Sequence, residues 1–197
     1  MADRPDLAAL IGSRICHDLV SPLGAVGNGI ELLTVGGAEG PETELIAENL
    51  AAAQGRIAVF RVAFGPARDE QVIEARARTD IAEGVQGSGR LTLDWAPEGP
   101  LARPAAKLAA LLMLCAESAL PRGGHLAVTH SRDGLQLAAE GRRVSLDEAL
   151  WPLLDGAAPT PELRAAHVQF PLAAQELARQ GRRAAVDATE TTLTITC

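Results

Sequence analysis

The chain has 197 residues, of which 47% are hydrophobic and 22% are charged, an ordinary balance for a globular protein. Its formal net charge is −7 and its basic residues form no stripe, which argues against nucleic acid and anionic membrane surfaces as partners. No apolar run approaches the roughly 20 residues of a membrane span, and the first ten residues lack the pattern of a secretion signal.

The chain contains three cysteines, which are widely spaced and form no CxxC motif: Cys16, Cys115 and Cys197. An odd, scattered set of cysteines suits a reducing compartment better than a disulfide framework. We therefore expect a cytoplasmic protein.

The first third of the chain has the periodicity of two helices. Between Ile11 and Leu33, apolar side chains recur on one side at about 100° per residue, and Gly36 then favours a helix end. Between Ile46 and Phe64, apolar residues are spaced alternately four and three apart, as in a helical bundle. Two helices alone bury little, so we expect an antiparallel hairpin that a second copy completes to a four-helix bundle.

The rest of the chain mixes helical and strand patterns, which predicts an α+β fold. Residues 1–68 are expected to form the helical hairpin domain, and residues 69–197 a two-layer α/β sandwich. The elements expected in the second part are a helix over 69–84, a strand over 90–95, an apolar helix over 102–120, a β-hairpin over 125–141, a short helix capped by Ser145, a helix over 161–180 and two closing strands.

A histidine and an aspartate interrupt the first helix, and a proline follows them. His17 lies in the middle of a small, polar stripe opposite the apolar side of the helix, so its ring is expected to be exposed. Ser21 lies on the same stripe and leaves room for a bulky partner. Pro22 cannot donate to the carbonyl of Asp18, at a cost of about 3 kcal/mol in a helix interior, so we expect a bend just beyond the histidine.

This pattern favours phosphoryl transfer. A neutral imidazole is a good nucleophile toward phosphorus, and its protonation balances near neutral pH. An adjacent carboxylate, here Asp18, can hold the imidazole in one tautomer, assist proton transfer or help to place a metal-bound phosphoryl group. Arg14, one turn before His17, could meet an anion at the histidine.

The same stretch resembles known phosphotransfer motifs. HDLVSP resembles the H-box of sensor histidine kinases, and residues 16–33, CHDLVSPLGAVGNGIELL, more specifically resemble the ChpT family of histidine phosphotransferases. The resemblance continues more weakly in RVAFG near the end of the second helix, in ALPRGG after the apolar helix, and in the short C-terminal domain.

The resemblance implies a homodimer in a bacterial phosphorelay. Its histidine would take a phosphoryl group from the receiver domain of a hybrid histidine kinase and pass it to the aspartates of response regulators. His17 matches the phosphorylated histidine and Asp18 its acidic neighbour, while Pro22 matches the kink. Asn28 matches an asparagine later on the same face. Mg²⁺ would be held chiefly by the partner receiver.

A kinase of this superfamily would also need an ATP site, and the motifs for one are missing. The segment LLMLCAESALPRGG lacks the expected asparagine, because Cys115 and Glu117 stand at the plausible positions, and no DxGxG motif follows. We therefore expect a degenerate ATPase-like domain that either docks receiver domains or has a purely structural, supporting role. The chain itself should bind no ATP, cofactor or metal.

Three other functions remain open at this point. An ATP-dependent kinase fragment would label itself from ATP, and a dimeric scaffold would work without His17. An HD-type phosphohydrolase would need an upstream histidine, which the chain lacks. The supporting residues also have purely structural interpretations: a solvated charge for Arg14, clearance for Ser21 and helix packing for Asn28.

Overall fold

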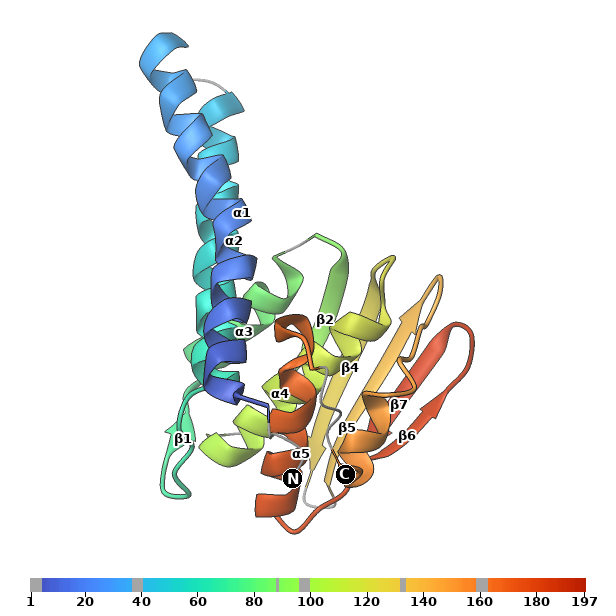
Figure 1. The fold of residues 1–197 in the computed structure, drawn as a ribbon. Helices are drawn as coiled ribbons and strands as arrows, with labels where there is room; N and C mark the ends of the chain where they lie inside the picture. The colour runs from blue at the N-terminus through green and yellow to red at the C-terminus, as the bar shows by residue number, and fades with distance from the viewer. Residues whose placement is uncertain (1–4, 37–40, 88, 96–99, 132–133, 159–162) are drawn as a thin grey trace.

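The computed structural model describes residues 5–36, 41–87, 89–95, 100–131, 134–158 and 163–197. It has the predicted α+β architecture, with two long helices that project from a domain containing a mixed sheet (Figure 1). Within these ranges, no helix combines the length and the apolar character that a bilayer crossing requires.

The hairpin consists of α1 (Leu7–Gly36) and α2 (Pro41–Ala63), which pack side by side (Figure 1). Asp6 caps α1, because its Oδ1 accepts hydrogen bonds from the backbone amides of both Ala8 and Ala9 at 3.1 Å. The helix runs through Pro22 without ending there, and the bend expected at this point stays a prediction. Helix α2 starts with proline, which lacks the amide hydrogen that a first helical turn leaves unpaired.

The hairpin leaves much of its apolar surface in solvent. Along α2, Ala53 and Phe60 are buried, but Leu50 and Ile57 of the same predicted seam are exposed. Within the described residues, Val72 is the one large exposed hydrophobic residue outside the hairpin. The exposed ones on α1 and α2 are Val20, Leu23, Ile30, Leu32, Leu45, Leu50 and Ile57.

The C-terminal domain is built on a five-stranded sheet in the order β2-β4-β5-β7-β6. Strands β2 and β4 are parallel, and all other neighbours are antiparallel. Alternate residues of β5, Leu135, Leu137 and Ala139, face the core, as the period of a half-buried strand predicts. The strands span Leu91–Trp95 (β2), Gly124–Ser131 (β4), Gly134–Gly141 (β5), Ala185–Ala188 (β6) and Thr192–Thr196 (β7).

Two helices form the layer between the sheet and the hairpin, α4 (Arg103–Ala119) and α5 (Gln169–Arg179) (Figure 1). Helix α4 is buried on nearly all sides, which explains its continuous apolar sequence. Phe170 at the start of α5 packs edge-on against Trp151, with ring centroids 5.3 Å apart.

The base of the hairpin is packed into this domain. Val59, Phe60 and Val62 of α2 belong to the same buried cluster as α4. Helix α3 (Ala75–Gln86) crosses α2 so closely that a Cβ atom at Gly84 would overlap the carbonyl of Gly55. These contacts fix the lower part of the hairpin against the domain, at the level where His17 lies.

The structure corrects three predicted elements. No helix begins at Ser145: the carboxylate of Asp147 accepts a hydrogen bond from the amide of Ala149, and only after this turn comes a short 3₁₀ helix, η1 (Trp151–Asp155). The helix predicted from Asp69 begins only at Ala75, because the strand β1 (Val72–Ile73) pairs with β3 (Leu101–Ala102).

The helix predicted over 161–180 is shorter and divided. Its first two residues lie outside the described ones, and a 3₁₀ turn, η2 (Ala165–His167), precedes α5. The β-hairpin and the two closing strands are confirmed, although residues 132–133 of the predicted turn also lie outside the described ranges. The division into residues 1–68 and 69–197 stays a prediction.

Candidate functional site

His17 projects from α1 into a cleft between the hairpin and the C-terminal domain. The cleft has a volume of about 630 Å³. The side chain of His17 is 84% exposed, so the prediction of an approachable ring is confirmed. Other residues that line the cleft are Ser21 and Pro22 from α1, Asn49 and Arg56 from α2, and Glu117 from α4.

The ring of His17 is held by its neighbour. Its Nδ1 lies 3.1 Å from Oδ1 of Asp18. An ionised carboxylate can only accept a hydrogen bond, so in the neutral ring Nδ1 carries the proton. The other nitrogen, Nε2, then has a lone pair available for attack on an electrophile.

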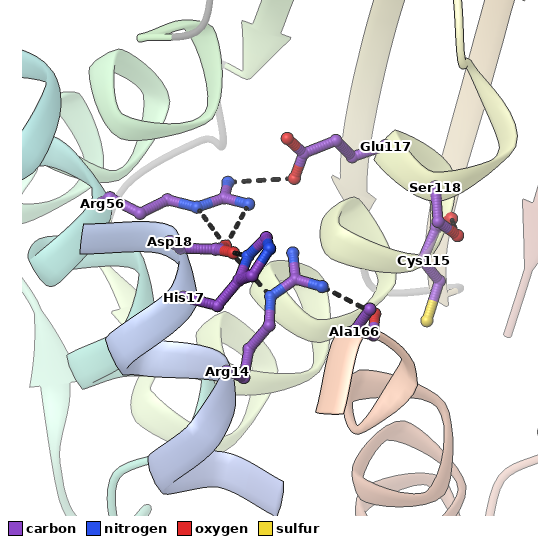
Figure 2. A network of polar contacts seen from close by, with 8 residues as sticks. All are labelled: Arg14, His17, Asp18, Arg56, Cys115, Glu117, Ser118 and Ala166. Carbon is purple, nitrogen blue, oxygen red and sulfur yellow. Dashed lines mark hydrogen bonds and ion pairs between the residues drawn. The ribbon is translucent and has the colours of Figure 1, made fainter. Parts of the chain in front are cut away.

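Asp18 is itself held by two arginines (Figure 2). Nε of Arg14 lies 2.9 Å, and Nη2 of Arg56 3.0 Å, from the same oxygen, Oδ2. Burial by itself raises the pKa of the Asp18 carboxyl, but the charge of Arg14, the hydrogen bond to His17 and the contacts of Arg56 outweigh it, so the net pKa is lowered. The carboxylate is therefore ionised at neutral pH.

The two arginines connect the hairpin to the C-terminal domain. Nη1 of Arg56 donates to Oε2 of Glu117 on α4 at 2.9 Å, and Nη1 of Arg14 donates to the carbonyl of Ala166 in η2 at 2.6 Å (Figure 2). Burial tends to lower the pKa of Arg56, but the carboxylates of Glu117 and Asp18 raise it overall. All four charged side chains thus form one partly buried network with two positive and two negative charges.

The structure brings together five of the six residues that the sequence singles out. Arg14, His17, Asp18, Ser21 and Pro22 all line the cleft. Arg14 is already engaged with Asp18, and its contact with an incoming anion stays a prediction.

Asn28 lies elsewhere. It is exposed, and about 16 Å of helix separates it from His17. It is not among the residues found to line the cleft in the described part of the chain. The roles of all six residues stay predictions.

Sequence reasoning missed Arg56, and it noted Glu117 only as a replacement for an asparagine. A signal for Arg56 was present: it follows Asn49 by seven residues, which places both on one face of α2, and both line the cleft. Arg56 pairs with Glu117, which lies 61 residues later in the chain, so no local sequence pattern predicts this pairing.

Comparison with known proteins identifies the family. A family model described as the histidine phosphotransferase C-terminal domain matches residues 74–192. The protein phosphotransferase ChpT of Brucella abortus (strain 2308) is 34% identical over 172 residues, which cover 83% of this chain and 81% of that protein. The chain belongs to the histidine phosphotransferase family.

The similarity of this histidine phosphotransferase extends to its three-dimensional structure. A solved bacterial phosphotransferase superposes with a TM-score of 0.81 at 30% identity, covering all of this chain and 97% of the other. The histidine kinase domain of the blue-light activated histidine kinase from Erythrobacter litoralis EL346 is 13% identical with a TM-score of 0.45, covering 93% of this chain and 94% of that one.

Proposed function

We propose that this histidine phosphotransferase works in a bacterial phosphorelay, and that His17 carries the phosphoryl group between the aspartates of receiver domains. The observation that carries the proposal is the exposed ring of His17, held through Nδ1 by an ionised carboxylate at the mouth of a cleft. Phosphoryl transfer needs positioning more than covalent machinery, and a rigid helix with one open nucleophile supplies it.

The chemistry follows from the hydrogen bond to Asp18. Nε2 attacks the phosphorus of a receiver's aspartyl phosphate, an N–P bond forms, the P–O bond breaks and the receiver's aspartate leaves as a carboxylate. The proton on Nδ1 stays in place, so the ring becomes cationic, and Asp18 stabilises that charge at 3.1 Å. Transfer to a response regulator is the reverse step, in which a second aspartate attacks and the neutral ring departs.

The proposed partners are the receiver domain of a hybrid histidine kinase, response regulators and a second copy of this chain. The exposed apolar side chains of the hairpin support the homodimer, because a second hairpin would bury them in a four-helix bundle. The scattered cysteines support a cytoplasmic location.

The C-terminal domain is proposed to have no ATP-dependent kinase activity. Cys115 and Glu117 stand at the plausible positions of the missing asparagine; Cys115 is fully buried in the core, and Glu117 binds Arg56. Neither side chain offers an amide to a nucleotide base. The chain is accordingly proposed to bind no cofactor, and Mg²⁺ would be supplied at the receiver.

The experiment is to mix the protein with a receiver domain phosphorylated on aspartate and to follow acid-labile label. Label should appear on the wild type and not on His17→Gln. Label that arrives directly from ATP would instead identify a kinase, and unchanged signalling in cells that carry His17→Ala would identify a scaffold. Stoichiometric, tightly bound transition metal would favour a hydrolase.

A further inference from the structure

We propose that Arg56 and Glu117 are positioning residues, through which the C-terminal domain holds His17 in its reactive tautomer. The inference rests on the proposed function of His17. It assigns to the second domain a direct part in the chemistry, in addition to any docking of receivers.

The geometry of Arg56 points to this role. Its Nε and Nη2 both donate to Oδ2 of Asp18, at 3.1 and 3.0 Å, while its Nη1 donates to Glu117 at 2.9 Å. A guanidinium is a rigid planar fork, so two carboxylates that bind different sides of it are held in a fixed relation. The position of Glu117 on α4 therefore sets the position of Asp18 on α1.

The two oxygens of the Asp18 carboxylate bind different partners. Both arginines bind Oδ2, which leaves Oδ1 to accept the hydrogen bond of His17 Nδ1. A carboxylate without these arginines could rotate about its Cβ–Cγ bond and present either oxygen to solvent. Arg56 thus acts on His17 through the orientation and the charge of Asp18.

Burial makes these contacts strong. The side chains of Asp18, Arg56 and Glu117 are 11%, 14% and 13% exposed, so solvent screens their charges poorly. Removing one partner would leave another charge buried and unpaired. The side chain of His17 is 84% exposed, so the hydrogen bond to Asp18 is the contact that orients its ring.

The C-terminal domain supports the second arginine as well. Arg14 donates to the carbonyl of Ala166, which belongs to the turn before α5. Both guanidinium groups that bind Asp18 are thus oriented by residues of the second domain.

A purely structural role for Arg56 makes a different prediction, and Arg103 provides the matched control. Arg103, the first residue of α4, donates to the carbonyls of Val62 and Arg61 near the end of α2. It therefore also joins the hairpin to the C-terminal domain, but it makes no described contact with Asp18 or His17. If Arg56 only joins helices, Arg56→Met and Arg103→Met should behave alike.

The first test is NMR of the full-length protein without any partner. Long-range ¹H–¹⁵N correlation reports the tautomer of His17, and a carboxyl ¹³C titration reports the pKa of Asp18. In Arg56→Met we expect a mixture of tautomers and a higher pKa for Asp18, whereas Arg103→Met should keep the wild-type values. The charged or titratable groups that line the cleft with Asp18 are Arg14 and His17 from α1, Arg56 from α2, Arg90 just before β2, Glu117 from α4 and His167 from η2.

The second test is the rate of phosphoryl transfer from a phosphorylated receiver at saturating receiver concentration. Arg56→Met should lower this rate about tenfold, the scale at which supporting residues act at functional sites. Arg56→Lys should restore part of it, because an ammonium can bind Asp18 but lacks the fork. Glu117→Gln should lower the rate in the wild-type background and have no further effect on Arg56→Met, since it acts through that arginine.

The inference is overturned if Arg56→Met keeps the tautomer, the Asp18 pKa and the transfer rate of the wild type, or if Arg103→Met changes them equally. Should Arg56→Met fail to fold, the nearly isosteric Glu117→Gln gives the same readouts, and wild-type values there would equally overturn the inference. Failure of the proposed function is distinguishable, because it would appear as label on His17→Gln or as no label on the wild type.

Discussion

The hairpin and the C-terminal domain are both largely apolar in sequence, but they bury their apolar residues to very different extents. On α4, Leu111 and Leu112 are fully buried, whereas Val20 and Leu23 on α1 are 69% and 52% exposed. His17, the proposed carrier of the phosphoryl group, lies on the region with the less complete core. The hairpin thus exposes apolar surface to solvent, while residues of the C-terminal domain contact the site through Arg56 and Arg14.

The largest stability effect is expected in the core of the C-terminal domain. Leu112→Ala should lower the free energy of unfolding by about 3 kcal/mol, because it removes buried methyl groups and leaves a cavity. Urea denaturation measures this change. Leu23→Ala, which truncates the same residue type on the exposed face of α1, is the control and should cost far less when unfolding of the single chain is measured. Equal costs would contradict the contrast between the two regions.

The crossing of α2 and α3 should be the next most sensitive point. Gly84→Ala should cost about 2 kcal/mol, because the new Cβ would meet the backbone of Gly55 and force the helices apart. Gly12→Ala is the matched control: nothing lies within 4 Å of a Cβ there, so the better helix former should stabilise the chain slightly. Thermal unfolding measures both effects, and a change in melting temperature of the same sign in both variants would contradict the close packing of α2 and α3.

A smaller, pH-dependent effect is expected at Asp18. The pKa of Asp18 is lower in the folded chain than its usual value of 3.8. Its carboxylate therefore stabilises the fold at any pH above 3.8, and this stabilisation is lost as the pH falls below 3.8. Asp18→Asn should therefore cost about 1.5 kcal/mol at neutral pH, and the difference from wild type should shrink below pH 3.8. Denaturation at a series of pH values measures it, and a difference that grows in acid would contradict the network.

Substitution of an exposed apolar residue of the hairpin should have the smallest effect on the free energy of unfolding. It should, however, have a clear effect on dimer formation. Leu23→Asp should change the free energy of unfolding of the single chain by no more than about 0.5 kcal/mol. It should nevertheless shift the mass in solution, measured by light scattering, from two chains toward one. Val72→Asp alters an equally exposed apolar residue outside the hairpin, and should leave the mass unchanged.

The sequence predicts those parts of the fold that depend on local periodicity. The 100° period around His17 correctly places its ring in solvent, and the hairpin pattern of residues 125–141 correctly predicts β4 and β5. The family resemblance rests on the same local string, residues 16–33.

Features that depend on tertiary contacts were not predictable in the same way. The strand at Val72 exists because it pairs with Ala102, far along the chain, and the helix expected after Ser145 is displaced by the turn at Asp147. The pairing of Arg56 with Glu117 likewise needs the whole domain to bring α2 and α4 together. Local patterns singled out His17 as the candidate nucleophile, and only the fold shows the contacts that connect its neighbour Asp18 to Arg56 and Glu117.

The central claim is that His17 reacts through Nε2 while Asp18 holds the proton on Nδ1. The most direct test is NMR of the ¹⁵N-histidine-labelled protein after transfer from a phosphorylated receiver, with ³¹P–¹⁵N coupling as the readout. We predict that phosphorus is bonded to Nε2 of His17 and to no other nitrogen. Phosphorus on Nδ1, or on another of the chain's histidines, would contradict the account.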